Sequence, residues 1–384
     1  MEEYKIVLAI DSFKGSGTTF EVEGWVAEGI QRTLKNSNIL QIPIADGGEG
    51  TVKSLTTALD GTFVTTTVFN SIGEEVEAEY GLLDSETAII EMAEASGMGL
   101  VENNLENVLK GNTYGVGQLI VHAIEKGVKK IYIGLGGSAT NDGGMGMAQA
   151  LGYQFIDKNG NIIDHKQTGA SSLKEVAKID ASKRLEALDD VTIMILSDVS
   201  NPLVGKNGAT AIYGPQKGVP KDRIEEIDSW MKQYADVIDA YTGKQISEIP
   251  GSGAAGGLGA GLLAFCHTEI YQGIDKMLEI INFEDTIKDA HLVITGEGSI
   301  DDQSIQGKAP IGIAKIAKKL NVPVMAIVGS RENDLTKVYD AGLDLVLSVI
   351  NRPMTLEEAI ENTEDNIITA GETAIRAFLL GKKR

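Results

Sequence analysis

Short apolar segments rich in β-branched residues recur along the chain and predict strands buried on both faces of a sheet. Between them lie segments in which apolar residues recur every three or four positions, the periodicity of a helix with one buried face. This alternation predicts α/β layers around mainly parallel sheets. The predicted strands are residues 5–10, 41–44, 130–134, 191–196, 292–295 and 323–328, and the predicted helices are residues 18–34, 49–59, 113–126, 223–241 and 309–320.

Residues 61–92 have a different pattern. The segments TFVTTTVF, EVEAEYGLL and TAIIEM follow one another with turns between them, which predicts antiparallel strands. No linker rich in proline or serine marks a domain boundary. The length of the chain and this change of pattern together predict two lobes.

Glycine is concentrated in the loops that follow the predicted strands. The chain has 45 glycines and only 8 prolines in 384 residues. In open α/β sheets the carboxyl ends of the strands form the ligand site, and glycine there lets backbone amides approach an anion. The loops therefore predict a site for a phosphate-bearing ligand; they are residues 11–17, 45–51, 135–146, 197–202 and 296–304.

The charge of the chain limits its partners. A formal charge of −21 repels nucleic acid and anionic membranes, so local cations or a metal must meet any anionic ligand. The single cysteine excludes an intrachain disulfide, and no apolar run approaches the roughly 20 residues of a membrane span. The first five residues include two glutamates and one lysine, whereas a signal peptide would be basic before an apolar stretch. We expect a soluble cytoplasmic protein with no nucleic-acid or membrane partner.

The same loops carry many acids and several lysines. Mg²⁺ held by one or two carboxylates together with substrate phosphates is a common use of such acids, and phosphoryl transfer needs backbone donors, a lysine, Mg²⁺ and a carboxylate. Any one of the acids is equally well explained as a helix cap. Their joint occurrence with glycine favours phosphoryl transfer; they are Asp11, Asp46, Glu49, Asp142, Asp198, Glu297, Asp301 and Asp302, with Lys14, Lys206, Lys217 and Lys308 nearby.

Two nucleotide-binding motifs can be tested directly. A P-loop is absent, because Asp302 stands where its first glycine is required and Ala309 follows Lys308. The dinucleotide fingerprint is matched by Gly134, Gly136 and Ala139, with Asp157 about 20 residues further on. This match leaves open a nicotinamide-dependent oxidoreductase of a 2-hydroxy acid. A non-catalytic sugar-acid sensor is a further alternative, although it needs far fewer carboxylates.

Several long strings, in order and over nearly the whole chain, resemble the bacterial type of the glycerate kinase family. They include DSFKGS at Asp11, PIADGGEGTV at Pro43, IEMAEASG at Ile90, GGSATNDGG at Gly136, GPQKG at Gly214, GAAGGLGAGLLAF at Gly253, VITGEGSID at Val293 and GKAPIGIA at Gly307. The resemblance implies ATP-dependent phosphorylation of D-glycerate with Mg²⁺, giving 2-phosphoglycerate in preference to 3-phosphoglycerate.

The resemblance also implies a fold. It consists of two α/β domains around a cleft, one with a flavodoxin-like sheet and one with a Rossmann-related, restriction-enzyme-like sheet. Residues 1–70 plus 285–384 are expected to form a discontinuous α/β domain. Residues 71–284 are expected to form an inserted α/β domain with antiparallel elements. The oligomeric state stays open, a homo-oligomer included.

Specific roles can be hypothesised for the loop residues. Asp198 or Asp46 accepts the proton of the glycerate hydroxyl, and Lys14 offsets charge on the transferred group. Glu297 and Asp301, with Asp11 as a further candidate, hold Mg²⁺. The residues expected to contact substrate or phosphate are Asp11, Ser12, Gly47, Gly48, Glu49, Gly136, Gly137, Ser138, Asn141, Asp142 and Lys308.

Three positions depart from the family pattern. Ser299 stands where members commonly carry arginine, so no cationic role is assigned there. Ser200 precedes Asn201, and no metal-ligand role is assigned to it. Gly17 replaces a more usual apolar residue and is expected to loosen the start of the helix that follows.

Overall fold

The computed structural model describes residues 3–301, 304 and 307–382, and it divides into two compact units. Unit 1 comprises Met1–Asp46, Lys53–Leu59 and Gln272–Arg384, and unit 2 comprises Gly47–Val52 and Asp60–Tyr271. Asp302, one of the candidate acids, lies outside the described residues.

The unit boundaries differ from the expected ones at both ends. Strand β3 (Thr62–Phe69) pairs along its whole length with β4 (Glu75–Leu82), so it belongs to unit 2 and the boundary lies before it, not at residue 70. Helix α10 (Gly273–Ile280) packs on α12 (Ala309–Lys319) of unit 1, which moves the second boundary from residue 284 to residue 271.

Unit 1 contains a five-stranded, fully parallel sheet in the order β13-β12-β11-β1-β2. Numbered along the unit, this order is 2-1-3-4-5, the flavodoxin-like order. The strand order reverses between β1 and β11, and ligands of such sheets bind beyond the carboxyl ends of the strands at that point. The strands are β1 (Tyr4–Ile10), β2 (Ser37–Gln41), β11 (Leu292–Ile300), β12 (Val324–Arg331) and β13 (Leu345–Ser348).

The second strand was predicted in the wrong place. The apolar residues 42–44 are buried but lie beyond strand β2, which ends at Gln41. As an edge strand, β2 pairs only with β1 and is mostly exposed, so it has no apolar run of its own. Pro43 lacks the backbone N–H that a strand extending through it would use.

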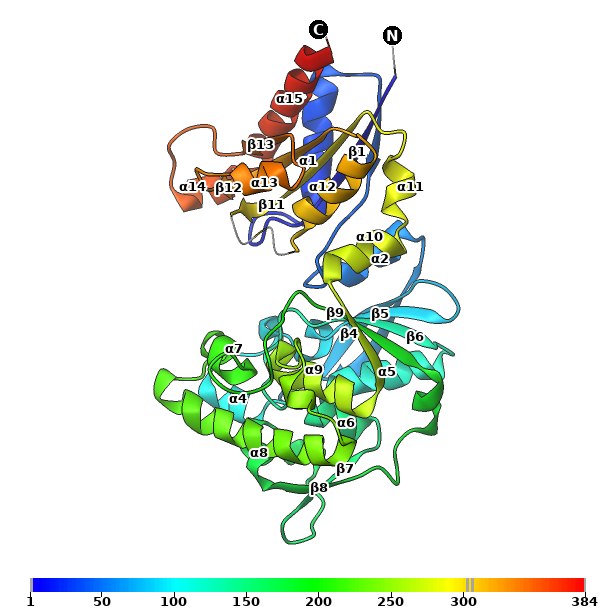
Figure 1. Cartoon of the computed structure of the whole chain (residues 1–384), viewed down its shortest axis with the longest axis vertical. Coiled ribbons are helices and arrows are strands. Elements are labelled where there is room, and N and C mark those ends of the chain that lie inside the picture. The colour runs from blue at the N-terminus through cyan, green and yellow to red at the C-terminus, as the bar shows by residue number, and fades with distance from the viewer. Residues whose placement is uncertain (1–2, 302–303, 305–306, 383–384) are drawn as a thin grey trace. The chain divides into compact units, whose positions relative to one another are not determined.

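Helix α1 (Thr19–Thr33) lies side by side with α15 (Thr363–Lys382) (Figure 1), and their apolar residues share one core with the sheet. The Thr18 hydroxyl accepts a hydrogen bond from Glu21 N, and the Glu21 carboxylate accepts one from Thr18 N, forming a capping box. Gly17 therefore does not loosen the start of α1, contrary to expectation; a Cβ atom there would lie 2.8 Å from the Trp25 ring. The other helices are α11 (Phe283–Ile287), α13 (Thr336–Asp340), α14 (Leu356–Glu361) and α2 (Thr51–Ala58), which the unit boundary divides.

Unit 2 contains a six-stranded mixed sheet in the order β10-β9-β6-β5-β4-β3. Strands β10, β9, β6 and β5 are parallel, whereas β4 and β3 are antiparallel, which confirms the antiparallel pattern predicted for residues 61–92. A separate antiparallel pair is formed by β7 and β8. The remaining strands are β5 (Thr87–Glu91), β6 (Lys130–Gly134), β7 (Gln154–Asp157), β8 (Val176–Asp180), β9 (Thr192–Leu196) and β10 (His267–Tyr271).

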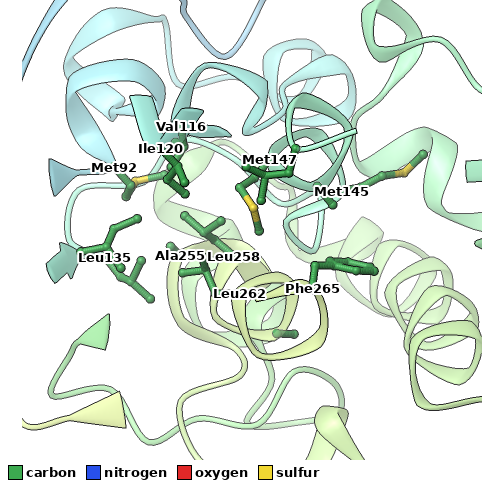
Figure 2. Close-up of a cluster of buried hydrophobic side chains, with 14 of the residues drawn as sticks. Met92, Val116, Ile120, Leu135, Met145, Met147, Ala255, Leu258, Leu262 and Phe265 are labelled. Carbon is green, nitrogen blue, oxygen red and sulfur yellow. The ribbon is translucent and has the colours of Figure 1, made fainter. Parts of the chain in front are cut away.

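Glycine-rich helix α9 (Ala254–Phe265) runs through the core of unit 2. Figure 2 shows Leu258 and Leu262 of α9 pointing toward Ile120 of α5 (Tyr114–Glu125) and Met147 of α6 (Met145–Ala150). No helix in the described part of the chain is both long and apolar enough to span a membrane. The other helices are α3 (Ala93–Ser96), α4 (Leu105–Lys110), α7 (Ala209–Lys217) and α8 (Ile224–Thr242), with 3₁₀ turns at Met98–Leu100, His165–Gln167, Ala170–Glu175, Glu186–Asp190, Lys221–Arg223 and Ile246–Glu248.

The α1–α15 contact gives a direct test of packing in unit 1. A Cβ atom at Gly29 would overlap the carbonyl oxygen of Ile368 on α15, so Gly29→Ala should destabilise the unit by about 1–3 kcal/mol. We expect a thermal midpoint several degrees lower in calorimetry. Gly24→Ala is the matched control, because Gly24 is exposed on the same helix with nothing within 4 Å of the added atom. Equal midpoints for the two variants would contradict the packing described.

Candidate active site

Three of the predicted acids gather in unit 1. Strands β1 and β11 are neighbours, with Ile10 opposite Gly296, and Asp11 N donates to Gly296 O over 3.0 Å. The loops that follow these two strands therefore start side by side. The charge of Asp46 acts on both Asp11 and Glu297. Unit 1 thus brings these three carboxylates together at the carboxyl edge of its sheet, where the sequence predicted a site.

Asp11 is held in an environment that resists its charge. Burial is the largest effect and raises the pKa of Asp11 to about 7, and the charges of Asp46 and Glu297 raise it further. The Ser12 backbone N–H, which donates to Asp11 Oδ1 over 2.6 Å, and the charge of Lys14 act in the opposite direction. These two groups offset the cost of the negative charge on Asp11 only in part, because the pKa stays raised.

Glu297 is buried at the end of the same sheet. Burial raises the pKa of Glu297 to about 7, although Lys308 and Ser304 oppose the shift. Lys308 Nζ lies 3.5 Å from Glu297 Oε2 and donates to Ser299 O over 3.2 Å. Glu297 Oε1 is buried with no hydrogen-bond partner in the described part of the chain. One oxygen of this carboxylate is thus left for a cation or a donor from outside.

Lys308 lies at the position predicted for it, immediately before α12. It is the N-cap residue of this 11-residue helix, whose first turn contains proline. A lysine at a helix N-terminus is unfavourable, because the helix dipole is positive there. The ion pair with Glu297 offsets part of that cost, and the same position suits an anion bound to both the ammonium and the helix amides.

The predicted metal ligands are only partly assembled. Asp301 Oδ1 accepts hydrogen bonds from Ser304 N at 2.9 Å and Ser304 Oγ at 3.0 Å. Among the residues that the structure describes, no three His, Cys, Asp or Glu side chains are grouped closely enough to hold a metal ion. A cation here would therefore depend on one or two carboxylates and on ligands from substrate phosphates, the arrangement that Mg²⁺ commonly takes.

Ser12 follows β1 and precedes a tight turn that carries Lys14. Gly17 N and Ser16 N both donate to Phe13 O, at 2.9 and 2.8 Å, and close the turn. This leaves Lys14 exposed at its tip. The Lys14 backbone N lies 3.9 Å from the position of a Cβ atom on Gly298 of β11, so the turn sits beside the strand that carries Glu297.

In unit 2 the predicted glycine loops touch each other. A Cβ atom on Gly136 would lie 2.7 Å from Gly48 Cα, and one on Gly134 would lie 2.6 Å from Gly47 O. Gly47 has φ +92° and would place a Cβ atom 2.8 Å from Leu196 O, at the end of β9. Only glycine permits this approach of three backbone segments. Glu49 is exposed in the same loop.

The tip of the loop after β6 presents backbone donors. Gly136 is half-buried and Gly137 is exposed. Gly137 O accepts from Met98 N and Ala139 N donates to Ser96 O, which fixes the loop on the segment after β5. The amides of Gly136, Gly137 and Ser138 donate to no acceptor in the described part of the protein. Consecutive backbone donors at the end of a strand are suited to an anion.

Asn141 and Asp142 lie deeper in this loop than a ligand contact requires. Both are fully buried. Asp142 accepts four hydrogen bonds, from Thr113 N, Thr113 Oγ1, Gly144 N and Gly146 N, at 2.9 to 3.2 Å. Burial raises the pKa of Asp142 against the effect of these bonds. The placement of Asp142 fits a group that holds the loop, not one that touches phosphate directly.

Asp198 lies two residues beyond β9 and is exposed, next to the strand end that Gly47 contacts. The candidate base thus belongs to the same loop cluster as the exposed amides. Ser200, the departure two residues further on, is also exposed.

Glu91 was missed as a candidate residue. It is the last residue of β5, is buried, and its Oε1 accepts from Val52 N over 2.7 Å. Burial raises the pKa of Glu91 to about 7, with the Val52 and Gly50 amides acting against it. The side chain ties the loop that contains Gly47 and Gly48 to the central sheet. The available signal was a charged residue ending an otherwise apolar strand.

The dinucleotide fingerprint lacks its required structural context. The next helix after Gly134, α6, begins only at Met145, so the glycines do not open a helix. Asp157 lies on the two-stranded sheet, where its Oδ1 accepts from Asn159 N and Asn161 N and closes a turn. The geometry gives no support to the oxidoreductase alternative.

The comparisons with known proteins agree with the motif strings. The model of the glycerate kinase family matches residues 6–379. A glycerate kinase of Halalkalibacterium halodurans is 46% identical over 357 residues, covering 93% of both chains. A glycerate 2-kinase of Escherichia coli K12 is 43% identical over 380 residues, covering 99% of both.

A solved structure extends the similarity to the fold. The crystal structure of a protein provisionally named glycerate kinase 2, from Salmonella typhimurium LT2, superposes with a TM-score of 0.86 at 42% identity and covers 100% of both chains. The match of the family model over nearly the whole length, together with these relatives, decides the classification: the chain belongs to the glycerate kinase family and is an enzyme of the kinase class.

Proposed function

We propose that the enzyme transfers the γ-phosphoryl group of ATP to the 2-hydroxyl of D-glycerate, with Mg²⁺, and releases 2-phosphoglycerate. Family membership supports glycerate as the substrate, and the name of the Escherichia coli relative, glycerate 2-kinase, supports the product. The observation that carries the proposal is the row of donor amides at Gly136, Gly137 and Ser138. Phosphoryl transfer depends on positioning and on donors aimed at phosphate oxygens.

Each unit, taken by itself, has groups suited to a phosphate group. In unit 2 the backbone amides of residues 136–138 provide hydrogen bonds without a Walker lysine. In unit 1, Lys308 and the N-terminus of α12 provide positive charge. A chain of net charge −21 needs such local donors to bind a polyanion.

The carboxylates of unit 1 fit a divalent cation. Asp11 and Glu297 are desolvated and repelled by Asp46, and Glu297 Oε1 has no partner in the described protein. Glu297 and Asp301, with Asp11 as a third candidate, are the residues that would hold Mg²⁺. Bound Mg²⁺ neutralises charge on phosphate oxygens during transfer. The protein's part is to hold these carboxylates in place, and a bound cation would favour their ionised form.

A carboxylate near the loop cluster accepts the proton of the glycerate hydroxyl. Asp198 and Asp46 are both candidates, and Asp198 has the more accessible side chain. Lys14, exposed at the tip of its turn, offsets charge on the transferred group. General-base catalysis contributes about 10²–10⁴ in rate, so loss of the base should be easy to measure.

The cytoplasmic location of the enzyme stays a prediction.

The product identifies the reaction. Incubation of the purified protein with ATP, Mg²⁺ and D-glycerate should give the phosphorus NMR signal of 2-phosphoglycerate. Formation of 3-phosphoglycerate would show that the 3-hydroxyl, not the 2-hydroxyl, is phosphorylated. If the protein consumes no ATP with any sugar acid, the proposed function is wrong and the sensor alternative is favoured.

Alanine substitutions test the assigned roles. Asp198→Ala should lower kcat by about 10²–10⁴, the range of a lost general base, and Lys14→Ala should also lower kcat, because charge on the transferred group is then uncompensated. Asp46→Asn shows whether Asp46 is the base instead. Lys35→Ala is the control, since Lys35 is exposed just after α1. If Asp198→Ala and Lys14→Ala both keep turnover within about threefold of the parent, the change is far short of the general-base range. The catalytic roles assigned to Asp198 and Lys14 would then be wrong.

The carboxylates of unit 1 should make stability depend on pH and on Mg²⁺. Burial raises the pKa of Asp11 and of Glu297 to about 7, from 3.8 and 4.5. The folded state therefore binds these protons more tightly, and without Mg²⁺ stability should fall as the pH rises from about 4 to about 7. Each pKa unit is worth about 1.4 kcal/mol.

Asp11→Asn should consequently raise the thermal midpoint at pH 8 by a few degrees, and the gain should shrink at pH 5. Mg²⁺ should raise the midpoint of the parent more at pH 8 than at pH 5, because protons compete with the cation, and Asp11→Asn should lose part of this effect. Asp236→Asn, on the exposed side of α8, is the control. The same Mg²⁺ response in the parent and in Asp11→Asn would exclude Asp11 from the cation site.

A further inference from the structure

Lys217 is a buried lysine that the proposed mechanism does not use. It is the last residue of α7, followed by Gly218 in the left-handed conformation, and is only 2% exposed. Its Nζ donates to Thr140 O over 2.6 Å and to Ser138 Oγ over 3.1 Å. Both acceptors belong to the loop whose tip carries the exposed amides. The ammonium therefore binds the protein's own backbone, out of reach of solvent.

Helix α7 holds this loop at two points along its length. Near its start, Thr210 Oγ1 accepts from Asn141 Nδ2 over 3.0 Å, and at its end Lys217 binds Ser138 and Thr140. Ser138 Oγ also accepts from Thr140 N over 3.2 Å, so Lys217 clamps both ends of one turn. On the side of β5 the loop is fixed by the hydrogen bonds of Met98 and Ala139 described above. Lys217 thus completes the bracing of residues 138–140.

Packing alone does not explain a lysine at this position. An ammonium removed from water carries a desolvation cost of several kcal/mol, and a methionine of similar length would fill the same space without it. Burial lowers the pKa of Lys217 to about 7, and the charge of Asp142 only partly opposes the shift. Because the lysine is present despite this desolvation cost, its hydrogen bonds to the loop explain why a lysine stands at this position.

We propose that Lys217 is a positioning residue, which fixes the turn at Ser138 and Thr140 so that the amides of Gly136 and Gly137 are aimed at a phosphate group of the nucleotide. The inference rests on the proposed function, since it assumes that the loop binds the nucleotide. Lys217 acts through the loop and touches no substrate. Its loss should weaken nucleotide binding specifically and leave the binding of glycerate unchanged.

The test uses the full-length enzyme and MgATP. Lys217→Met keeps the length of the side chain and removes the donors; it should raise KM for ATP, and Kd for MgATP in calorimetry, by about 10- to 100-fold, the range for hydrogen bonds made by a charged group. KM for glycerate should stay within about twofold, far below that range. A purely structural loss of folded enzyme would instead lower kcat and leave both KM values unchanged, and that result would overturn the proposal.

Two further variants keep the positioning role testable if Lys217→Met fails to fold. Ser138→Ala removes one acceptor of Lys217 and should raise KM for ATP by less; combined with Lys217→Met it should add little, because both changes break the same clamp. Strict additivity would contradict the mechanism. Lys221→Met, exposed in the turn after α7, is the control and should bind MgATP as the parent does.

The two proposals fail in different ways. If the parent phosphorylates glycerate but Lys217→Met and Ser138→Ala both bind MgATP normally, the positioning role is wrong and the proposed function stands. If the parent phosphorylates no glycerate, the proposed function is wrong. In that case, weaker binding of MgATP to Lys217→Met than to the parent still supports the positioning role of the lysine. Equal binding to both would show that this role is wrong.

Discussion

Direct contact between backbone segments, with no side chains between them, is the constraint on which the loops of unit 2 depend. Gly134 and Gly136 lie against Gly47 and Gly48 so closely that a Cβ atom would fall within 2.6 to 2.7 Å of the opposite chain. Gly256 at the start of α9 would likewise overlap the carbonyl oxygen of Thr140. This packing brings main-chain amides to the end of the sheet, where side chains would otherwise keep an anion away. This need explains the glycines at these loop positions.

Unit 1 contributes charge in place of backbone donors. Its flavodoxin-like strand order puts the loops after β1 and β11 side by side, and Asp11 and Glu297 follow those strands. Their burial next to Asp46 makes the ionised state costly unless a cation is present. The feature that costs stability in the folded protein is therefore the same one that suits a divalent ion and a phosphate chain.

Periodicity predicted the central elements well. Strand β6 begins and ends at the predicted residues, and α1, α5, α8 and α12 begin and end within one residue of the predictions. These elements are buried on at least one face, so their apolar patterns are strong. Edge strand β2 was misplaced, because an exposed strand has a weak apolar pattern. The first unit boundary was placed after β3, although the antiparallel pattern predicted for residues 61–92 already joined this segment to β4.

The sequence predicted which loops lie together within each unit, but not the contacts of individual side chains. Glycine and acid clustering marked the loops that the fold brings together within each unit. The role of Glu91 depends on an amide 39 residues away, and that of Lys217 on a hydroxyl 79 residues away. No local pattern reports such contacts. The burial of Asp142, predicted to meet phosphate, likewise depends on Thr113 in a distant helix N-terminus.

The proposed function requires the backbone of the loop after β6 to bind the phosphate groups of the nucleotide. Amide NMR of protein labelled with ¹⁵N-glycine and titrated with MgATP measures this binding at single residues. The signals of Gly136 and Gly137 should shift as binding saturates, while that of Gly160, in the exposed turn that Asp157 closes, should not. Unchanged Gly136 and Gly137 signals at saturating MgATP would show that these amides do not bind the nucleotide.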